Sequence, residues 1–300
     1  MKPVVLVTGA AGLIGGYLLR TAGRWASRWD VRGLTRHDGD LTGQTSVRAL
    51  WERHRPAVII HCAALSRTGA CESDPVRARR INVEATWHLA EVARDIPFIF
   101  LSSDQVFDGA KGQYVETDDV HPLNVYGRTK AEAEQVVLAN PGHSVIRVAL
   151  TAGTSSTGDR SFVEDMLRAA TRGATLTLFT DEFRCPIPAG PLARAIWELV
   201  ERQRPGLYHL GGQERLSRWE IGELIAGWYP ELQPAIRPGS VADYLGPPRP
   251  PDLSMKSDKL QQWLSFPLPG FRRWLSRPRP AGRDAWDESS PVTYFGSDRM

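Results

Sequence analysis

Tyr126 and Lys130 stand four positions apart in a segment whose apolar residues have helical spacing. Residues i and i+4 are neighbours on one face of a helix, so this spacing places the Lys130 ammonium beside the Tyr126 phenol. A neighbouring cation favours the phenolate, and we therefore expect Lys130 to lower the pKa of Tyr126. A tyrosine tuned in this way can donate a proton to the alkoxide that forms when a ketone is reduced.

Two hydroxyl side chains and a carboxyl, Ser102, Ser103 and Asp104, follow a predicted buried strand upstream of Tyr126. A hydroxyl at the end of that strand could hydrogen-bond a substrate carbonyl and hold it against Tyr126 and a nicotinamide ring. We therefore predict that the catalytic residues are Ser103, Tyr126 and Lys130. Asp104 is predicted to bind the substrate.

A glycine-rich run, TGAAGLIG, follows the first predicted strand and opens a helix. Glycine at positions 9, 12 and 15 lets the backbone approach a pyrophosphate closely, and the helix N-terminus adds amide donors and a positive dipole end. The run therefore predicts a dinucleotide site. We assign five of its residues to that site: Gly9, Gly12, Leu13, Ile14 and Gly15.

Arg36 follows the end of the second predicted strand. Dinucleotide-binding folds recognise the ribose 2′ position at this place in the chain. An arginine attracts a 2′-phosphate, whereas an acidic residue would repel it, so Arg36 favours NADP(H) over NAD(H). Asp40 and Leu41 suit the adenine edge of the same pocket, and Ala63 and Ala64 are assigned to the cofactor site as well.

Short apolar runs alternate with helix-length segments through the first half of the chain. The predicted strands cover residues 4–7, 31–34, 58–61, 98–101 and 144–148, and the predicted helices cover 13–23, 46–54, 75–94 and 125–139. The strands show little polar/apolar alternation, which is typical of strands buried on both faces of a parallel sheet. We therefore predict an α/β fold with a doubly wound parallel Rossmann sheet, and ligands at the carboxyl ends of its strands.

The last third of the chain differs in composition, since residues 230–280 hold 11 of the 22 prolines. We divide the chain into an NADP-binding Rossmann domain (1–150), a smaller C-terminal substrate-binding domain (151–276) and a loosely attached tail (277–300). Two segments near 174–210, namely 176–179 and 207–210, are expected to return to the sheet as extra strands.

Composition excludes several classes of protein. Hydrophobic residues are 42 % of the 300, which is enough for a sizeable core, and the net charge of +3 does not suggest a nucleic-acid binder. The three cysteines and seven histidines have no metal-ligand spacing, and no apolar stretch is long enough to span a bilayer. We expect a cytoplasmic protein without metal, nucleic-acid or membrane binding, and a homodimer is left open.

Four blocks of sequence resemble those of extended short-chain dehydrogenase/reductases, and within them the dTDP-4-dehydrorhamnose reductases. They are LSSDQVFDG (101–109), PLNVYGRTK (122–130), DEFRCP (181–186) and RPPDLS (249–254), within a resemblance that spans residues 3 to 264. By this resemblance Ser103, Tyr126 and Lys130 match the catalytic triad. The glycine loop and Asn82 match cofactor-site positions, where Tyr126 and Lys130 also contact the cofactor.

The resemblance implies NADPH-dependent reduction of the 4-keto group of a nucleotide-linked 6-deoxy sugar. Arg184 and Arg249 would bind its diphosphate or sugar, because an arginine fork suits phosphate oxygens. Three departures concern the substrate. Ser103 stands where the family usually has Thr, Gln105 stands where it usually has Tyr, and residues 148–150 lack an aromatic.

Related chemistries remain as alternatives. A nucleotide-sugar 4,6-dehydratase needs a glutamate base after Asp104, and the amide of Gln105 cannot act as one. An NAD-dependent nucleotide-sugar epimerase is a lesser alternative, disfavoured by Arg36.

The regulatory β subunit of methionine adenosyltransferase shares the same blocks and is the main alternative. In that case the chain would bind NADP and a partner protein. Three aromatic residues of the tail, Trp286, Tyr294 and Phe295, could form the docking surface.

Overall fold

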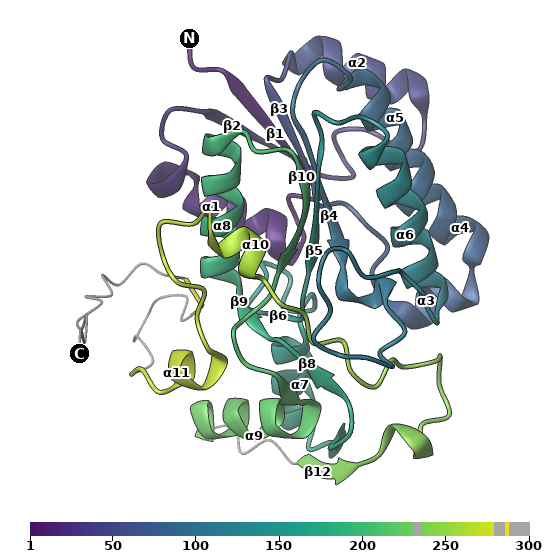
Figure 1. The fold of residues 1–300 in the computed structure, drawn as a ribbon, viewed down its shortest axis with the longest axis vertical. Helices are drawn as coiled ribbons and strands as arrows, with labels where there is room; N and C mark the ends of the chain where they lie inside the picture. Colours follow the sequence, from purple (N-terminus) through teal and green to yellow (C-terminus); the bar gives the residue numbers. More distant parts are fainter. Residues whose placement is uncertain (231–235, 279–285, 288–300) are drawn as a thin grey trace.

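A six-stranded parallel sheet forms the centre of the molecule in the computed structural model, which describes residues 1–230, 236–278 and 286–287 (Figure 1). In chain order the strands are β1 (Val4–Thr8), β2 (Asp30–Leu34), β3 (Val58–His61), β4 (Phe98–Ser103), β5 (Ser144–Val148) and β10 (Gly206–Leu210). Their spatial order is β10-β5-β4-β3-β1-β2, so the direction of winding reverses between β1 and β3. In doubly wound folds ligands bind outside the carboxyl ends of the strands at such a switch point. The predicted Rossmann sheet is confirmed.

Helices cover both faces of this sheet (Figure 1). One face carries α2 (Gln44–His54), α5 (Ala85–Val92) and α6 (Val125–Leu138), and the other carries α1 (Leu13–Trp25) and α8 (Ala189–Arg202). Each connection therefore runs over one face and returns the chain to the same edge of the sheet. This arrangement brings the residues that follow the strands together at the carboxyl edge.

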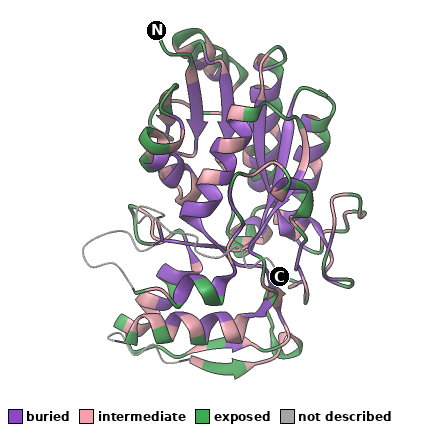
Figure 2. Cartoon of the chain, turned by 60° about the vertical axis from the view of Figure 1, so that its left-hand side comes forward, coloured by how far each residue is buried: buried purple, intermediate pink, exposed green. Residues whose placement is uncertain are grey.

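Successive side chains of a strand point to opposite faces, and both faces are apolar here. In β4, Phe98 and Phe100 pack into the cluster under α5 and α6, whereas Ile99 and Leu101 pack into the cluster under α1 and α8. Figure 2 shows the central strands buried between the helices. Burial on both faces explains why these segments lack a polar/apolar alternation.

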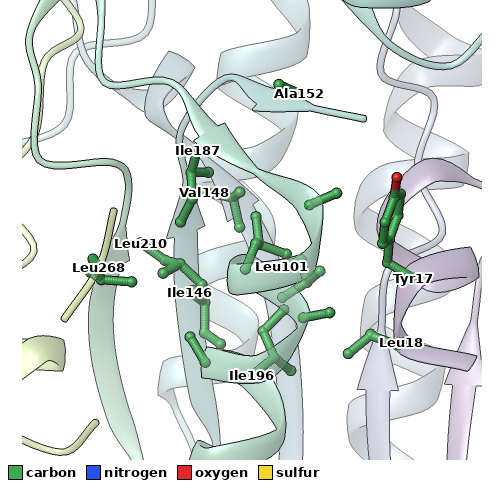
Figure 3. Close-up of a cluster of buried hydrophobic side chains, with 14 of the residues drawn as sticks. Tyr17, Leu18, Leu101, Ile146, Val148, Ala152, Ile187, Ile196, Leu210 and Leu268 are labelled. Atoms are coloured by element: carbon green, nitrogen blue, oxygen red, sulfur yellow. The ribbon is translucent and has the colours of Figure 1, made fainter. Parts of the chain in front are cut away.

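The larger of the two clusters also reaches the second lobe (Figure 3). Tyr17 of α1, Ile146 of β5 and Ile196 of α8 belong to it, and so does Leu268 from the last part of the chain. Each fully buried side chain of this size contributes about 1.5–3 kcal/mol relative to exposure. The two lobes therefore share one core.

The helix expected over residues 75–94 is interrupted by a π-helix. α4 (Pro75–Arg79) is capped by the Asp74 carboxylate, and the chain then forms the π-helix over Arg80–Glu84 before α5 begins. The π-turn carries Asn82, whose side chain is buried. π-turns of this kind occur frequently at functional sites.

The second lobe is built from short strand pairs and helices below the sheet (Figure 1). The pairs are β6 (Thr151–Ala152) with β9 (Ile187–Pro188), β8 (Phe183–Arg184) with β11 (Leu216–Ser217), and β7 (Leu176–Phe179) with β12 (Ile236–Gly239). The helices of this lobe are α7 (Phe162–Thr171), α9 (Arg218–Trp228) and α11 (Phe271–Leu275). The short α10 (Asp258–Gln261) instead lies beside the edge strand β10 of the central sheet (Figure 1).

Of the two segments expected to return to the central sheet, one does so. β10 pairs with β5 as its sixth strand, so the prediction for 207–210 is confirmed. The prediction for 176–179 is wrong, because β7 pairs with β12 in a separate two-stranded sheet. A short apolar run encodes a strand but not its partner.

The tail predicted over residues 277–300 falls largely outside the described residues, including Tyr294 and Phe295. Trp286 is described, and it is fully buried against Phe271 and Trp228. Its indole Nε1 donates a hydrogen bond to the Tyr229 hydroxyl at 3.1 Å. Trp286 is therefore part of the core, and the idea that it belongs to an exposed docking surface is wrong.

Within the described part of the chain, no helix combines the length and apolar character that a membrane crossing requires. The same residues contain no group of three or more His, Cys, Asp or Glu side chains arranged to hold a metal ion.

Candidate active site

Ser103 ends β4 at the carboxyl edge of the sheet and begins a short 3-10 turn. Its hydroxyl accepts a hydrogen bond from the backbone N–H of Gln105 at 3.2 Å and donates one to Asp104 Oδ1 at 3.0 Å. Both Ser103 and Asp104 are buried. Burial raises the pKa of Asp104, an effect that Arg184 opposes.

The first turn of α6, which carries Tyr126, has its backbone donors capped from two directions. Asn124 is the N-cap, and its Oδ1 accepts from the backbone N–H of Gly127 at 2.9 Å. Glu72 of α3 (Thr68–Ser73) accepts from the backbone N–H of Val125 at 2.6 Å. These caps fix the position at which the helix begins.

Gly127 allows this helix to start directly against the turn that follows β4. A Cβ at this position would lie 2.1 Å from the carbonyl oxygen of Gln105. The Gln105 side chain adds a second link, since its Oε1 accepts from Asn124 Nδ2 at 2.8 Å. The close approach brings Tyr126 within hydrogen-bonding reach of Ser103.

The electrostatics of Tyr126 differ from the expectation that Lys130 lowers its pKa. Burial raises the pKa of Tyr126 above its ordinary value, the hydrogen bond with Ser103 lowers it, and the Asp104 carboxylate raises it. The Lys130 ammonium lies over the ring of Phe100, 3.8 Å from its centroid, and does not offset the increase in the pKa of Tyr126. That expectation is therefore wrong for this arrangement.

Lys130 is itself buried on α6, and burial lowers its pKa to about 7, with Glu134 opposing the change. Because its pKa is raised, Tyr126 is held as a neutral phenol, the form that can donate a proton. Lys130 is poised between its two protonation states at neutral pH.

The glycine loop lies at the same edge of the sheet, where it follows β1 and packs against the residues that follow β3. Gly9 has φ +67°, and a Cβ on it would lie 2.7 Å from the backbone nitrogen of Ala63. A Cβ on Gly15 would lie 2.4 Å from the carbonyl oxygen of Gly9. Only glycine permits this close packing of loop, strand and helix.

The N-terminus of α1 is suited to an anion. Gly12 is its N-cap, no side chain caps it, and no acidic residue lies in its first turn. The backbone donors of Leu13 and Ile14 are therefore not used by any capping side chain among the described residues. A dinucleotide pyrophosphate fits such a site.

The remaining residues of the predicted cofactor pocket surround that loop. Arg36 is exposed just after β2, and Ala63 and Ala64 are half-buried after β3. The carboxylate of Asp40 accepts from Thr42, and Leu41 packs on the cluster under α5.

Asn82 holds the loop after β3 to α6. Its Oδ1 accepts from the backbone N–H of Leu65 at 2.8 Å, and its Nδ2 donates to the carbonyl of Leu65 at 3.1 Å and to Thr129 Oγ1 at 2.9 Å. The amide is thus fully used within the protein. Because Thr129 directly precedes Lys130, Asn82 helps to position Lys130.

A cluster of charged side chains stands next to Asp104 at the start of the second lobe. Glu182 is almost fully buried and accepts from Arg184 Nη2 at 2.8 Å and from Arg249 Nε at 2.7 Å. Arg184 Nε also lies 3.8 Å from Asp104 Oδ2. The structure therefore brings the predicted substrate residues Asp104, Arg184 and Arg249 together around Glu182.

Glu182 and Arg218 of the same cluster were not predicted from the sequence. Burial acts to raise the pKa of Glu182, but Arg184 and Arg249 outweigh it and hold the value below the ordinary range. Burial lowers the pKa of Arg218 to about 10, with Glu182 opposing. No local motif marks either residue, because their partners come from distant segments.

A parallel Rossmann sheet, a glycine-rich first turn and a Ser-Tyr-Lys set at the carboxyl edge define the class of short-chain dehydrogenase/reductases. Within it, the chain belongs to the RmlD substrate binding domain family, whose model matches residues 1–278.

Two curated relatives illustrate this membership, and one solved structure shares the fold. The dTDP-4-dehydrorhamnose reductase of Sinorhizobium fredii is 33 % identical over 268 residues, which cover 84 % of this chain and 90 % of the relative. Methionine adenosyltransferase 2 subunit beta of Xenopus laevis is 32 % identical over 86 % of this chain and 81 % of the relative. The dTDP-4-dehydrorhamnose reductase of Bacillus anthracis in complex with NADP has a TM-score of 0.85 at 24 % identity, covering 92 % of this chain and 98 % of that one.

Proposed function

We propose that the protein reduces the 4-keto group of a nucleotide-linked 6-deoxy sugar with NADPH. The observation that carries this proposal is the close packing of the start of α6, which carries Tyr126, against the turn that begins at Ser103. This turn lies at the same carboxyl edge of the sheet as the glycine loop. The relation to dTDP-4-dehydrorhamnose reductase over 84 % of the chain supports the choice of substrate.

Each residue of the site has a role in this reaction. Bound NADPH supplies a hydride to the carbonyl carbon at C4 of the sugar. Ser103 donates a hydrogen bond to the carbonyl oxygen and orients it, and Tyr126 gives that oxygen its proton. Lys130 binds the nicotinamide ribose. A hydroxyl and a phenol aimed at the oxygen where negative charge develops stabilise the transition state.

The substrate is held by the second lobe. Asp104 accepts hydrogen bonds from sugar hydroxyls, and Arg184 and Arg249 face the diphosphate or sugar. Gln105 follows Asp104 directly, and its amide is linked to the start of α6. An amide at this place removes the proton-abstracting base that a dehydratase needs, so the product is the reduced sugar.

The cofactor site favours NADP(H) through Arg36. The guanidinium is exposed at the end of β2 and meets a 2′-phosphate there. Replacing it in Arg36→Glu is expected to raise the KM for NADPH at least about tenfold and to leave the KM for NADH near its original value. An equal change for both cofactors would contradict the assignment.

The test of the reaction uses purified protein, NADPH and a dTDP-linked 4-keto-6-deoxy sugar, with NADH in parallel. We expect loss of NADPH absorbance together with a new C4 hydroxyl in the product. NADPH binding without consumption across a panel of nucleotide-linked keto sugars would overturn the proposal.

A second function is favoured by one observation, the 32 % identity to methionine adenosyltransferase 2 subunit beta over 86 % of the chain. In that function the chain binds NADP and the catalytic subunit of a methionine adenosyltransferase. Co-elution with that subunit in gel filtration, without turnover of keto sugars, would favour it over the reductase.

A further inference from the structure

The charged cluster at the start of the second lobe holds more positive than negative charge. It contains the guanidiniums of Arg184, Arg218 and Arg249 and the carboxylates of Asp104 and Glu182. Asp104 and Glu182 are both almost fully buried. Arg184 is buried as well, whereas the Arg249 side chain is 33 % exposed. An enclosed cation is costly unless a carboxylate, a ligand or water compensates it.

Both carboxylate oxygens of Glu182 are already used. Oε1 accepts from Arg184 at 2.8 Å and from Arg249 at 2.9 Å, and Oε2 accepts from Arg249 at 2.7 Å. These contacts satisfy the carboxylate and tie two of the three arginines to it. Arg218 is the remaining cation.

Arg218 is held in place by its backbone and by a neighbouring aromatic ring. Its backbone N–H donates to the carbonyl of Glu182 at 2.8 Å, and Ser217 and Glu220 form a capping box at the start of α9. The ring of Phe162 lies 4.9 Å from its Cζ. Its Nη1 is completely enclosed and has no hydrogen-bond partner among the described residues.

An enclosed, unpartnered guanidinium donor beside a satisfied carboxylate is the arrangement expected of an anion subsite. Burial lowers the pKa of Arg218 only to about 10, so it is a cation at neutral pH. The carbonyl of Glu182 accepts from the backbone N–H of Arg218, and its carboxylate binds Arg184. Arg184 Nε in turn lies 3.8 Å from Oδ2 of Asp104, the neighbour of Ser103. The subsite therefore lies within the reach of a sugar bound at Ser103.

We propose that Arg218 is a substrate-binding residue whose guanidinium takes a phosphate oxygen of the nucleoside diphosphate group. The inference rests on the proposed function, since it names the group of the same substrate that this residue recognises. It distinguishes Arg218 from Arg184 and Arg249, which Glu182 holds in place. Arg184 and Arg249 face the substrate from positions that Glu182 fixes, whereas Nη1 of Arg218 has no partner among the described residues.

The experiment compares Arg218→Gln with Arg272→Gln by isothermal titration with dTDP, thymidine, pyrophosphate and NADPH. Arg272 is an exposed arginine of α11 that pairs with Glu220 of α9, the helix that begins at Arg218. Replacing either arginine with glutamine changes the net charge by the same amount. Arg218→Gln is expected to weaken the affinity for dTDP and for pyrophosphate at least about tenfold, which is the effect of losing one charged hydrogen bond. Thymidine and NADPH affinities should stay within about twofold, as should every affinity of Arg272→Gln.

An unchanged affinity of Arg218→Gln for dTDP would overturn the inference, and so would an original protein that binds neither dTDP nor pyrophosphate. If Arg218→Gln does not fold, Arg218→Lys decides in the same titration. Arg218→Lys keeps the positive charge but loses the planar guanidinium. We expect a several-fold loss of affinity for dTDP and an unchanged affinity for thymidine. Binding of dTDP that depends on Arg218, in a protein that turns over no keto sugar, would support this inference and contradict only the proposed reduction.

Discussion

The phenol of Tyr126 is protonated in the resting protein because its surroundings disfavour the phenolate. Burial and the Asp104 carboxylate both raise its pKa, and the hydrogen bond with Ser103 offsets only part of the increase. A neutral phenol next to a hydroxyl is suited to giving a proton to a ketone oxygen. The roles of Ser103 and Tyr126 therefore follow from their environment as well as from their spacing.

Removing the phenol oxygen should separate chemistry from binding. Tyr126→Phe is expected to lower kcat by about 10²- to 10⁴-fold, the usual contribution of a general acid. NADPH affinity should remain within about twofold, because the ring still fills its place. The matched control is Tyr208→Phe in β10, whose hydroxyl lies 3.5 Å from the carbonyl of Pro205. Retention of most of the rate in Tyr126→Phe would show that another group donates the proton.

At the scale of elements, the site depends on how closely α6 approaches the end of β4. Gly127 permits the approach, and Asn124 and Glu72 fix the start of the helix. Asn82 ties the loop after β3 to the same helix. Three segments thus converge on the turn that carries Tyr126.

A methyl group at Gly127 should disturb this geometry. In Gly127→Ala the new Cβ would lie 2.1 Å from the Gln105 carbonyl, so the helix must shift away from Ser103. We expect kcat to fall about 10- to 100-fold, since small displacements of reacting groups have effects of this size. Gly23→Ala in α1 is the control, because nothing lies within 4 Å of its added Cβ, and it should keep full activity. Equal activity of the two variants would contradict the argument.

Buried histidines on the strands make stability depend on pH. Burial and the Arg147 guanidinium lower the pKa of His209 in β10 to about 3. The unfolded chain binds a proton below about pH 6.5 that the folded chain does not, so the free energy of unfolding falls as the pH drops from about 6.5 toward 3. One such group accounts for about 2 kcal/mol at pH 5.

Urea unfolding at about pH 7.5 and pH 5 measures this effect. Between these two pH values, the free energy of unfolding of His209→Gln should fall less than that of the original protein. Exposed His37 provides the control, and His37→Gln should show the original dependence. The same pH dependence in all three proteins would rule out His209 as a source.

Much of the site could be predicted from the sequence because its residues lie in contiguous motifs. The glycine loop, Ser103, Tyr126 and Lys130 each follow a recognisable strand or open a helix. Arg218 and Glu182 could not be found this way, because their partners come from segments far apart in the chain. The raised pKa of Tyr126 was also missed, since burial is a property of the folded molecule.

At the scale of the whole molecule, the two lobes share one core that extends to the last described residues. Trp286 packs against Phe271 and Trp228, and its carbonyl accepts from the backbone N–H of Gly190 at the start of α8. A residue from the end of the chain is thereby fixed to the helix that covers the sheet. The sequence around it is polar and gave no sign of this burial.

Truncation of this side chain should destabilise the protein as a whole. Trp286→Ala is expected to lower the free energy of unfolding by about 3–5 kcal/mol, the usual loss for a buried aromatic residue. The control is Trp87→Ala, since Trp87 is 44 % exposed and its loss should cost less than about 1 kcal/mol. Denaturant unfolding gives both values, and a similar small effect for the two would show that Trp286 is not part of the core.

Transfer of deuterium from the cofactor tests the central claim most directly. The protein is incubated with NADPH deuterated at C4 of the nicotinamide ring and a dTDP-linked 4-keto-6-deoxy sugar, and the product is examined by mass spectrometry and NMR. Our account predicts one deuterium at C4 of the sugar, and none when Tyr126→Phe replaces the original protein on the same time scale. Cofactor binding with no deuterium in any nucleotide-linked keto sugar of a panel would contradict the account.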